Sequence, residues 1–314
     1  MPPIINDDFI IYSGTASPEF LKFRLGQDLY APFINYKFSH PGTCWYNIPS
    51  RLGTRLYFKK NSPQIFDFFA QLIARRINAG KKILLIAKKM FIDYCKNEMQ
   101  QKLCALGLHN VRVVDTGEEI DISDINIIPI INYGMIGINT FESYDCAYCL
   151  TGYYVNEDII NTILQDIVAS DMYIPINIKT VGVPRRRKAE VLNYRDRVYD
   201  INYLAQMALD QMEMDTVIQA VGRVRPYTKP REIITFQCAG HPQLEYTEEF
   251  NSIAEARQFF DILSCRKLNQ SDNRAKIQLG MREGLTQAET AAKLDLSIRT
   301  VKRYWRVNGD TNTI

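Results

Sequence analysis

Apolar and polar residues alternate with two different periods over the first half of the chain. Apolar residues recur at helical spacing in two stretches, 63–79 and 91–106, and a glycine follows each stretch. Two short apolar runs, 81–87 and 111–114, have the character of strands that are buried on both faces. Strand and helix units of this length predict an α/β domain with a parallel sheet, flanking helices and right-handed crossovers.

The same alternation continues along the chain. The pattern predicts a strand that runs into a Gly-rich turn within 127–141, further strands over 144–150 and 232–238, and a helix over 156–169. Residues 21–60, by contrast, are rich in aromatic and turn residues and have no clean period. This composition is typical of a linker or of a segment that crosses between two domains.

The pattern near the C-terminus predicts two short helices. Thr286 and Glu289 have the spacing of a capping box, in which each side chain bonds the other residue's main-chain N–H at the start of a helix. A tight turn at Asp295 follows, and Ser297 is placed to cap a second helix over 298–307. A helix, a short turn and a helix make up the helix-turn-helix arrangement.

This C-terminal stretch resembles helix-turn-helix DNA-binding domains in its small, turn and apolar positions, although most such domains have Gly where Asp295 stands. Residues 265–306 carry ten basic and four acidic residues, whereas the net charge of the whole chain is only +3. The resemblance implies that the exposed side of the second helix enters the major groove of duplex DNA. Its candidate contact residues are Ser297, Arg299, Thr300, Lys302, Arg303 and Arg306. The alternative is a basic helical hairpin that binds another part of the protein.

A second candidate site lies in residues 217–226. Valines recur on one face of a predicted helix here, and Gln219 and Arg223 share another face. Pro226 cannot continue the helix, which is therefore predicted to end one or two residues before it. The guanidinium groups of Arg223 and Arg225 at the end of an anchored helix suit a phosphate partner, because they can bind it bidentately. Two solvated surface arginines are the alternative.

Residues 219–226 resemble motif VI of superfamily 2 helicases, the Q-x-x-G-R segment that supplies an arginine finger to ATP bound between two RecA-like lobes. The match lies at Gln219, Gly222 and Arg223. The second arginine follows after two residues instead of the usual three, so that either Arg223 or Arg225 is the finger. By this resemblance, Gln219 and Gly222 line the nucleotide.

Two further segments resemble helicase motifs in the expected order. Residues 10–18 read as a strand that ends in a Ser-Gly-Thr turn, similar to motif III at the end of a first lobe. Gly137 and Asn139 lie in the Gly-rich turn that follows the strand predicted within 127–141, and they resemble motif V, which contacts nucleotide and nucleic-acid backbone. A plain structural turn is the alternative for both residues.

The sequence contains neither a G-x-x-x-x-G-K-[ST] phosphate loop nor an acidic D-E-x-x box on a strand. Without these elements the chain has little to hydrolyse ATP with. The resemblance therefore implies the C-terminal part of a superfamily 2 DNA helicase or translocase, which binds ATP and Mg²⁺ only together with a Walker-motif-bearing lobe on another chain. Whether the chain is itself an enzyme stays open. The alternative is a non-catalytic replication or regulatory protein that binds DNA and keeps the lobe as a scaffold.

We accordingly expect three parts: a remnant of a first lobe with a linker over 1–60, a second RecA-like lobe over 61–263, and a small all-α helix-turn-helix domain over 264–314. DNA and the partner lobe are the expected partners.

Composition and residue spacing bear on the location of the protein and on bound metals. The longest apolar run, 125–138, is too short and too often interrupted to span a membrane, and no signal-peptide pattern occurs, so we expect a cytoplasmic protein without a membrane partner. Seven cysteines without a framework spacing indicate reduced thiols. Cys146 and Cys149 have metal-knuckle spacing but no second pair nearby, so we expect no zinc and no other bound metal in this chain. The basic run 185–188 is typical of a solvated loop, with contact to a nucleic-acid backbone as the alternative.

Overall fold

The computed structural model describes most of the chain between residues 39 and 305. The described ranges are 39–49, 55–135, 139–168, 178–183, 186–192, 200–241, 244–262 and 265–305. The chain divides into two compact units, Met1–Phe260 and Asp261–Ile314, which we describe separately.

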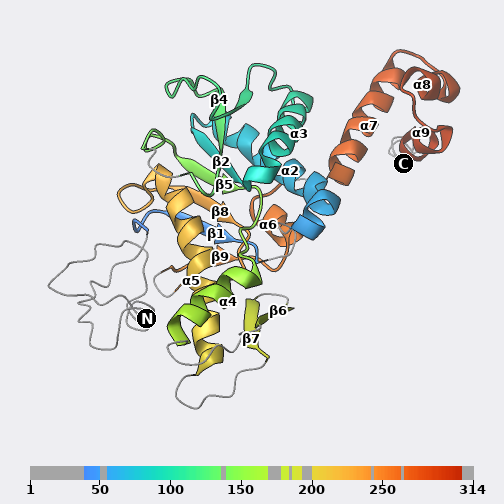
Figure 1. The fold of residues 1–314 in the computed structure, drawn as a ribbon. Helices are drawn as coiled ribbons and strands as arrows, with labels where there is room; N and C mark the ends of the chain where they lie inside the picture. Colours follow the sequence, from blue (N-terminus) through green and yellow to red (C-terminus); the bar gives the residue numbers. More distant parts are fainter. Residues whose placement is uncertain are drawn as a thin grey trace. The chain divides into compact units, whose positions relative to one another are not determined.

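A seven-stranded parallel sheet forms the centre of the first unit (Figure 1). The order of its strands is β3-β4-β2-β5-β8-β1-β9, and every neighbouring pair is parallel. This sheet confirms the predicted α/β class and is consistent with a RecA-like fold. The strands are β1 (Cys44–Asn47), β2 (Ile83–Ala87), β3 (Arg112–Asp115), β4 (Ile127–Asn132), β5 (Cys146–Cys149), β8 (Glu232–Thr235) and β9 (Glu248–Glu249).

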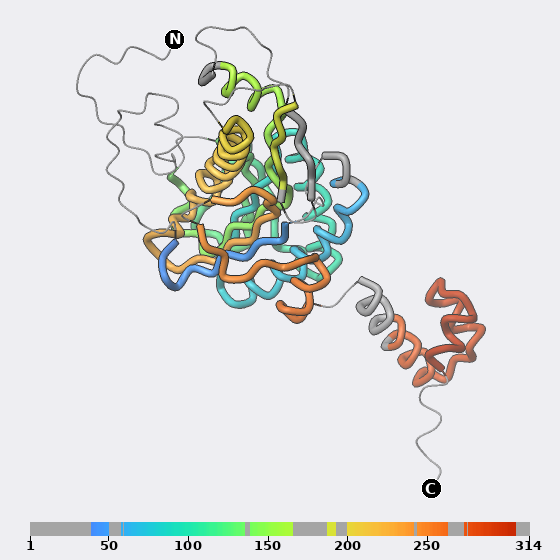
Figure 2. The backbone as a smooth tube through the Cα atoms, turned by 90° about the horizontal axis from the view of Figure 1, so that it is seen from below, coloured from blue at the N-terminus to red at the C-terminus, as the bar shows by residue number. Residues whose placement is uncertain are grey.

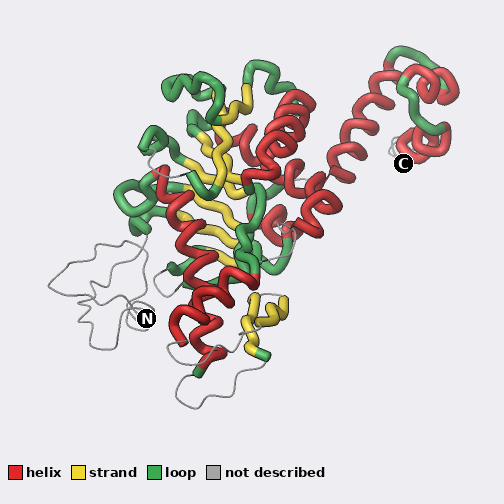
Figure 3. The backbone as a smooth tube through the Cα atoms, viewed as in Figure 1, coloured by secondary structure: helices red, strands yellow, loops and turns green. Residues whose placement is uncertain are grey.

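Helices cover both faces of this sheet (Figure 3). Helix α5 packs on one face, where Val217 and Val221 meet Leu84 of β2 and Ala147 of β5. Helices α2 and α3 cover the other face, where the ring of Phe69 lies 5.4 Å from that of Tyr148. The strands between them are buried on both sides, which explains their nearly continuous apolar sequence. The helical elements of this unit are α2 (Arg55–Asn78), η2 (Lys89–Phe91), α3 (Ile92–Ala105), α4 (Glu157–Val168), α5 (Ile201–Val221), η3 (Gly222–Val224) and α6 (Ile253–Phe259).

The interpretation of residues 21–60 as a linker is wrong for its described second half. Strand β1 lies inside the sheet, between β8 and β9, and α2 begins before residue 60. Trp45 is buried and donates from Nε1 to Thr235 Oγ1 at 3.3 Å, and Asn47 donates from Nδ2 to the carbonyl of Gln237 at 2.9 Å. A four-residue strand with both faces buried has no alternating pattern, and therefore the sequence did not reveal it. The motif III-like segment at 10–18 lies outside the described residues.

A small antiparallel hairpin, β6 (Ile178–Val183) and β7 (Arg186–Val191), stands apart from the main sheet. Its strand β7 lies with α4 beside the N-terminal half of α5, as Figure 2 also shows, in a core that includes Ile160, Ala189 and Leu204. The interpretation of 185–188 as a solvated loop is wrong for residues 186–188, because these residues form part of β7. Arg185 lies outside the described residues.

The second unit contains α7 (Cys265–Arg282), α8 (Gln287–Lys293) and α9 (Ile298–Trp305), and α7 packs against both shorter helices. The predicted capping box of Thr286 and Glu289 at the start of α8 is confirmed. Asp295 has a left-handed backbone with φ 49°, a conformation that Asp tolerates better than most residues. The N–H of Leu296 bonds the carbonyl of Ala291 at 3.0 Å, which is the long hydrogen bond of a Schellman motif.

Within the part of the chain that the structure describes, no helix is both long enough and apolar enough to cross a membrane.

Candidate functional site

The C-terminal end of α5 carries the first candidate site. Val217, Val221 and Val224 are fully buried, whereas Gln219 is exposed, so the predicted apolar stripe is confirmed. The α-helix ends at Val221, and a single 3₁₀ turn continues it to Val224, where the sequence predicts the end of the helix. We refer to residues 222–226 as the arginine turn.

Arg225 reverses the direction of the chain in this turn. Its backbone is left-handed, with φ 55° and ψ 55°, and its N–H bonds the carbonyl of Gly222 at 3.0 Å. This conformation costs a residue with a Cβ about 1–2 kcal/mol, and glycine adopts it without that cost. The following Pro226 excludes the right-handed helical alternative for Arg225. Backbone strain of this kind clusters at functional sites, which makes Arg225 a candidate functional residue.

The side chain of Arg225 reaches the segment that follows β4. Its Nη2 donates to Asn139 Oδ1 at 3.0 Å, and its Nη1 donates to the hydroxyl of Tyr227. The guanidinium also lies over the Tyr227 ring, 5.8 Å from its centroid. An arginine has five N–H donors, and within the described residues only two of those of Arg225 have partners. Its free donors can therefore bind an anion.

Arg223 contacts the same segment closer to β4. Its Nη2 donates to the carbonyl of Met135 at 2.8 Å, and the side chain is half-buried. The structure thus brings both predicted arginines against the segment of residues 133–145, which carries Asn139. Gly137, the other predicted residue of this segment, lies outside the described residues.

Gly222 leaves open space at the start of the arginine turn. A Cβ atom at this position would meet no atom within 4 Å among the described residues, and its φ of −55° is one that any residue adopts. Neither the backbone nor the packing therefore requires glycine here. The open space leaves room for close approach of a ligand to the main chain.

Arg231 fixes the arginine turn to the same segment, and the sequence analysis missed it. Its Nε donates to the carbonyl of Val224 at 2.6 Å, and its Nη2 donates to the carbonyl of Glu142 at 2.7 Å. The side chain is buried. A buried guanidinium shared between two main-chain carbonyls sets the distance between the two segments. An arginine one residue before a strand carries no spacing signal that could have identified this role.

Residues before β1 hold the turn from the other side. The hydroxyl of Thr43 donates to the carbonyl of Pro226 at 2.8 Å, and the main-chain N–H of His40 bonds the same carbonyl at 2.7 Å. The main-chain N–H of Arg231 in turn donates to Thr43 Oγ1 at 3.2 Å. The arginine turn is therefore held by contacts distant in sequence, and it is a rigid platform for its two arginines.

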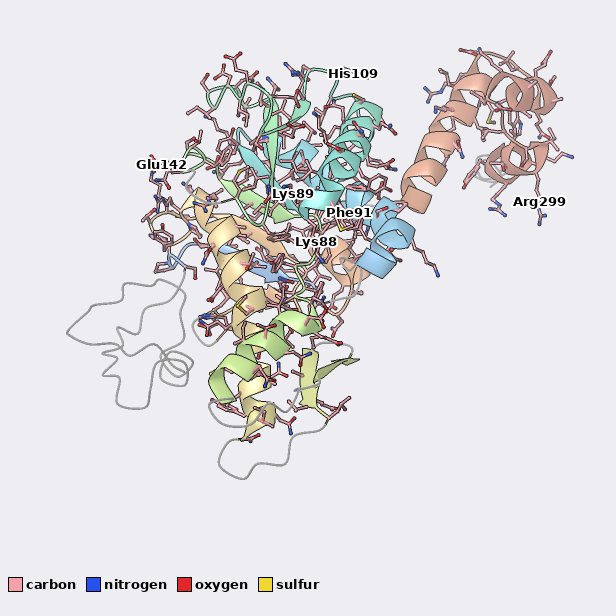
Figure 4. All side chains as sticks on the ribbon, in the orientation of Figure 1. Lys88, Lys89, Phe91, His109, Glu142 and Arg299 are labelled. Atoms are coloured by element: carbon pink, nitrogen blue, oxygen red, sulfur yellow. The ribbon has the colours of Figure 1, made fainter. Side chains whose placement is uncertain are left out.

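A second group of charges lies near the carboxyl ends of β2 and β5. The ammonium of Lys88 (Figure 4) is 5.3 Å from the centroid of the Tyr154 ring, and the guanidinium of Arg187 is 5.6 Å from it. Arg187 also forms an ion pair with Glu213 of α5, whose side chain is fully buried. Burial raises the pKa of Glu213 to about 7, although Arg187 and the N–H of Val155 oppose the shift. This arrangement makes Arg187 part of the packing between β7 and α5 and unsuited to a loose contact with nucleic acid.

The third candidate surface lies on α9 in the second unit. Arg299, Lys302 and Arg303 are exposed, and Figure 4 shows Arg299 pointing away from the helix bundle. The hydroxyls of Ser297 and Thr300 bond each other at 2.8 Å, and Ser297 Oγ accepts the N–H of Thr300 at 3.2 Å, as its predicted cap role requires. The predicted contact residue Arg306 lies outside the described residues.

No protein-family model, no curated protein and no solved structure matches the chain. Among the described residues there is no group of three or more His, Cys, Asp or Glu side chains that could hold a metal ion. Cys146 and Cys149 are buried in β5, and burial raises the pKa of both thiols to about 12. What the chain does must therefore be inferred from the arginine turn and from α9.

Proposed function

We propose that this chain is the C-terminal part of a superfamily 2 DNA helicase or translocase, comprising a second RecA-like lobe and a DNA-binding helix-turn-helix tail. The observation that carries the proposal is the arginine turn, which is held rigidly against the segment that follows β4. Its arginines and Asn139 belong to two motif-like segments far apart in sequence. A hydrogen bond from Arg225 to Asn139 joins the two segments. The parallel sheet that positions both segments is consistent with the RecA-like architecture.

Arg225 and Arg223 have different roles in this proposal. Arg225 has donors without a partner among the described residues and is bonded to neutral, exposed groups, so it can exchange them for a phosphate. Arg223 holds the loop through the Met135 carbonyl and lies next to the open space at Gly222. Arg225 would then stabilise charge on the γ-phosphate of ATP, with Arg223 as the second candidate. The partner lobe would hold most of the nucleotide and its Mg²⁺.

Measurement of ATP turnover by the isolated chain tests whether it needs a partner lobe for hydrolysis. We expect no turnover with or without DNA, because the phosphate-binding lysine and the Mg²⁺-binding carboxylate lie on another chain. Measured turnover that Arg223→Ala or Arg225→Ala abolishes would show that the chain is a complete ATPase and would refute the proposal.

DNA binding by the tail is tested by truncation. The full-length chain and a chain that ends near Cys265 are titrated with the same fluorescent duplex at low and at higher salt. We expect truncation to remove most of the affinity and most of its salt dependence, because the tail carries a surplus of six positive charges over residues 265–306. Equal affinity of the two chains would rule out the tail as the DNA-binding element.

A second candidate is a non-catalytic DNA-binding replication or regulatory protein with the same lobe as a scaffold. The bond between Arg223 and the Met135 carbonyl favours it, because a main-chain partner gives that arginine a structural role without any nucleotide. Tight, sequence-specific DNA binding without a response to ATP would support this candidate. A reading frame that encodes a Walker A motif directly upstream would support the split helicase.

A further inference from the structure

Cationic side chains dominate the outward face of α9, which also exposes Ile298. Arg299, Lys302 and Arg303 are three and four residues apart, so they project from one face of the helix. The buried Val301 lies on the opposite side, toward α7 and α8. The described helix, Ile298–Trp305, contains no carboxylate and no side-chain amide.

These cations have no neutralising partner within the described part of the second unit. Glu283 pairs with Lys293 at 2.7 Å, and Glu289 accepts from Thr286 in the capping box. Asp295 lies four residues before Arg299, but no ion pair joins it to α9 among the described residues. The hydroxyls of Ser297 and Thr300 bond each other at the start of α9. The outward face therefore offers mainly charged N–H donors, and the side-chain acceptors at α9 among the described residues are hydroxyl oxygens.

A surface rich in charged N–H donors favours some base pairs over others. In the major groove, guanine presents two adjacent acceptors, N7 and O6, which match the two parallel N–H groups of a guanidinium. Adenine presents one acceptor beside a donor and cytosine presents a donor, so their best partners are an amide and a carboxylate, respectively. Neither group is present on the described part of α9. Arginine suits this bidentate contact better than lysine, whose ammonium acts as a point charge.

We propose that α9 reads guanines in the major groove through Arg299 and Arg303, with Lys302 on a neighbouring phosphate. The two arginines are separated by about 6 Å along the helix axis, which is close to two base-pair steps of about 3.4 Å. The inference rests on the proposed DNA-binding function of the tail and adds the bases that it recognises.

The test uses the full-length chain and three short duplexes of one mixed sequence that contains several G-x-G steps. The first duplex is unmodified. In the second, 7-deazaguanine replaces guanine and removes the N7 acceptor from the major groove. In the third, inosine replaces guanine, which keeps N7 and O6 but removes the amino group in the minor groove. We expect the 7-deazaguanine duplex to bind roughly 10-fold more weakly than the unmodified one, and the inosine duplex to bind like the unmodified one.

Single substitutions show which residues cause the difference in affinity between the unmodified and the 7-deazaguanine duplex. Arg299→Ala and Arg303→Ala should each weaken binding to the unmodified duplex and shrink its advantage over the 7-deazaguanine duplex. Lys302→Ala should weaken binding to both duplexes alike and reduce the salt dependence. Arg274→Ala, which removes an exposed arginine of α7, is the matched control and should keep the full difference.

Two negative results are distinguishable. Equal binding of the unmodified and the 7-deazaguanine duplex would overturn guanine readout while leaving DNA binding by the tail intact. Absence of binding to all three duplexes at low salt would refute the proposed DNA-binding function itself.

Discussion

Arg225 and Asn139 are 86 residues apart in sequence, and a hydrogen bond of 3.0 Å between Nη2 and Oδ1 joins them. Asn139 belongs to the segment that leaves β4, and Arg225 belongs to the turn that ends α5. The bond therefore couples the carboxyl side of one central strand to the end of the helix that covers the sheet. A ligand that displaces Asn139 from the guanidinium would therefore contact both segments.

The substitution Gly222→Ala separates a structural from a ligand-binding role of the arginine turn. The position has ordinary helical dihedral angles and open space for a Cβ, so alanine should raise the free energy of unfolding by about 0.5–1 kcal/mol. If phosphate groups approach the main chain here, the same methyl group should weaken binding of inorganic triphosphate, measured by chemical shifts of the full-length chain.

Gly240→Ala is the matched control, because its Cβ also meets no atom within 4 Å and it lies outside the arginine turn. A Gly222→Ala chain that is more stable and binds triphosphate as the wild type does would show that Gly222 does not face the ligand.

Arg231 positions the arginine turn and should be sensitive to substitution. Arg231→Ala leaves the carbonyls of Val224 and Glu142 without this donor in a buried place, so we expect a loss of about 2–4 kcal/mol in urea unfolding. Arg231→Lys keeps the charge but cannot span both carbonyls, and should recover only part of the loss. Lys229→Ala removes an exposed cation from the same loop and should change stability little. A near-neutral Arg231→Ala would contradict the positioning role.

The sequence predicts the elements of this protein better than the contacts between them. Long periodic stretches identified α3 and α4, and the capping box of Thr286 identified α8, because these signals are local. The sequence pattern did not predict strand β1, because both faces of the strand are buried and it pairs only with strands distant in sequence. The sequence also could not predict the hydrogen bonds of Arg231. Their acceptors are main-chain carbonyls, which every residue has.

Glu213 should make stability depend on pH. Burial raises its pKa from 4.5 to about 7, so the folded chain binds a proton more tightly than the unfolded chain between these values. The free energy of unfolding should therefore fall as pH rises from 4.5 to 7, by at most about 3 kcal/mol from this group, and should stay lower above pH 7. Glu213→Gln keeps an acceptor for Arg187 but does not titrate, so urea unfolding at several pH values should show a flatter profile.

Glu190→Gln makes the same change of charge at an exposed position of β7 and should preserve the wild-type profile. If Glu213→Gln also preserved it, another group would have to be the source of the pH dependence.

The substitution Gly280→Ala tests the packing of α7 on α8, because Gly280 lies close to Thr290. A Cβ on Gly280 would lie 2.9 Å from Thr290 Oγ1 and 3.0 Å from Cγ2, which is too close for a buried contact. Gly280→Ala should therefore destabilise the second unit by about 1–3 kcal/mol. Thr290→Ala removes both clashing atoms, including a buried hydroxyl that has no hydrogen-bond partner among the described residues. The double variant should then regain most of the lost stability.

Tryptophan fluorescence can report on this unit alone. The chain has two tryptophans, and in a Trp45→Phe background the remaining one is Trp305 of α9. Thermal unfolding followed by Trp305 should shift to lower temperature in Gly280→Ala and return toward the starting value when Thr290→Ala is added. A coupling of this kind is expected for residues in contact, whereas distant residues have nearly additive effects. Additive effects of the two substitutions would mean that α7 and α8 do not pack at this point, and the support of α9 by α7 would then have to be revised.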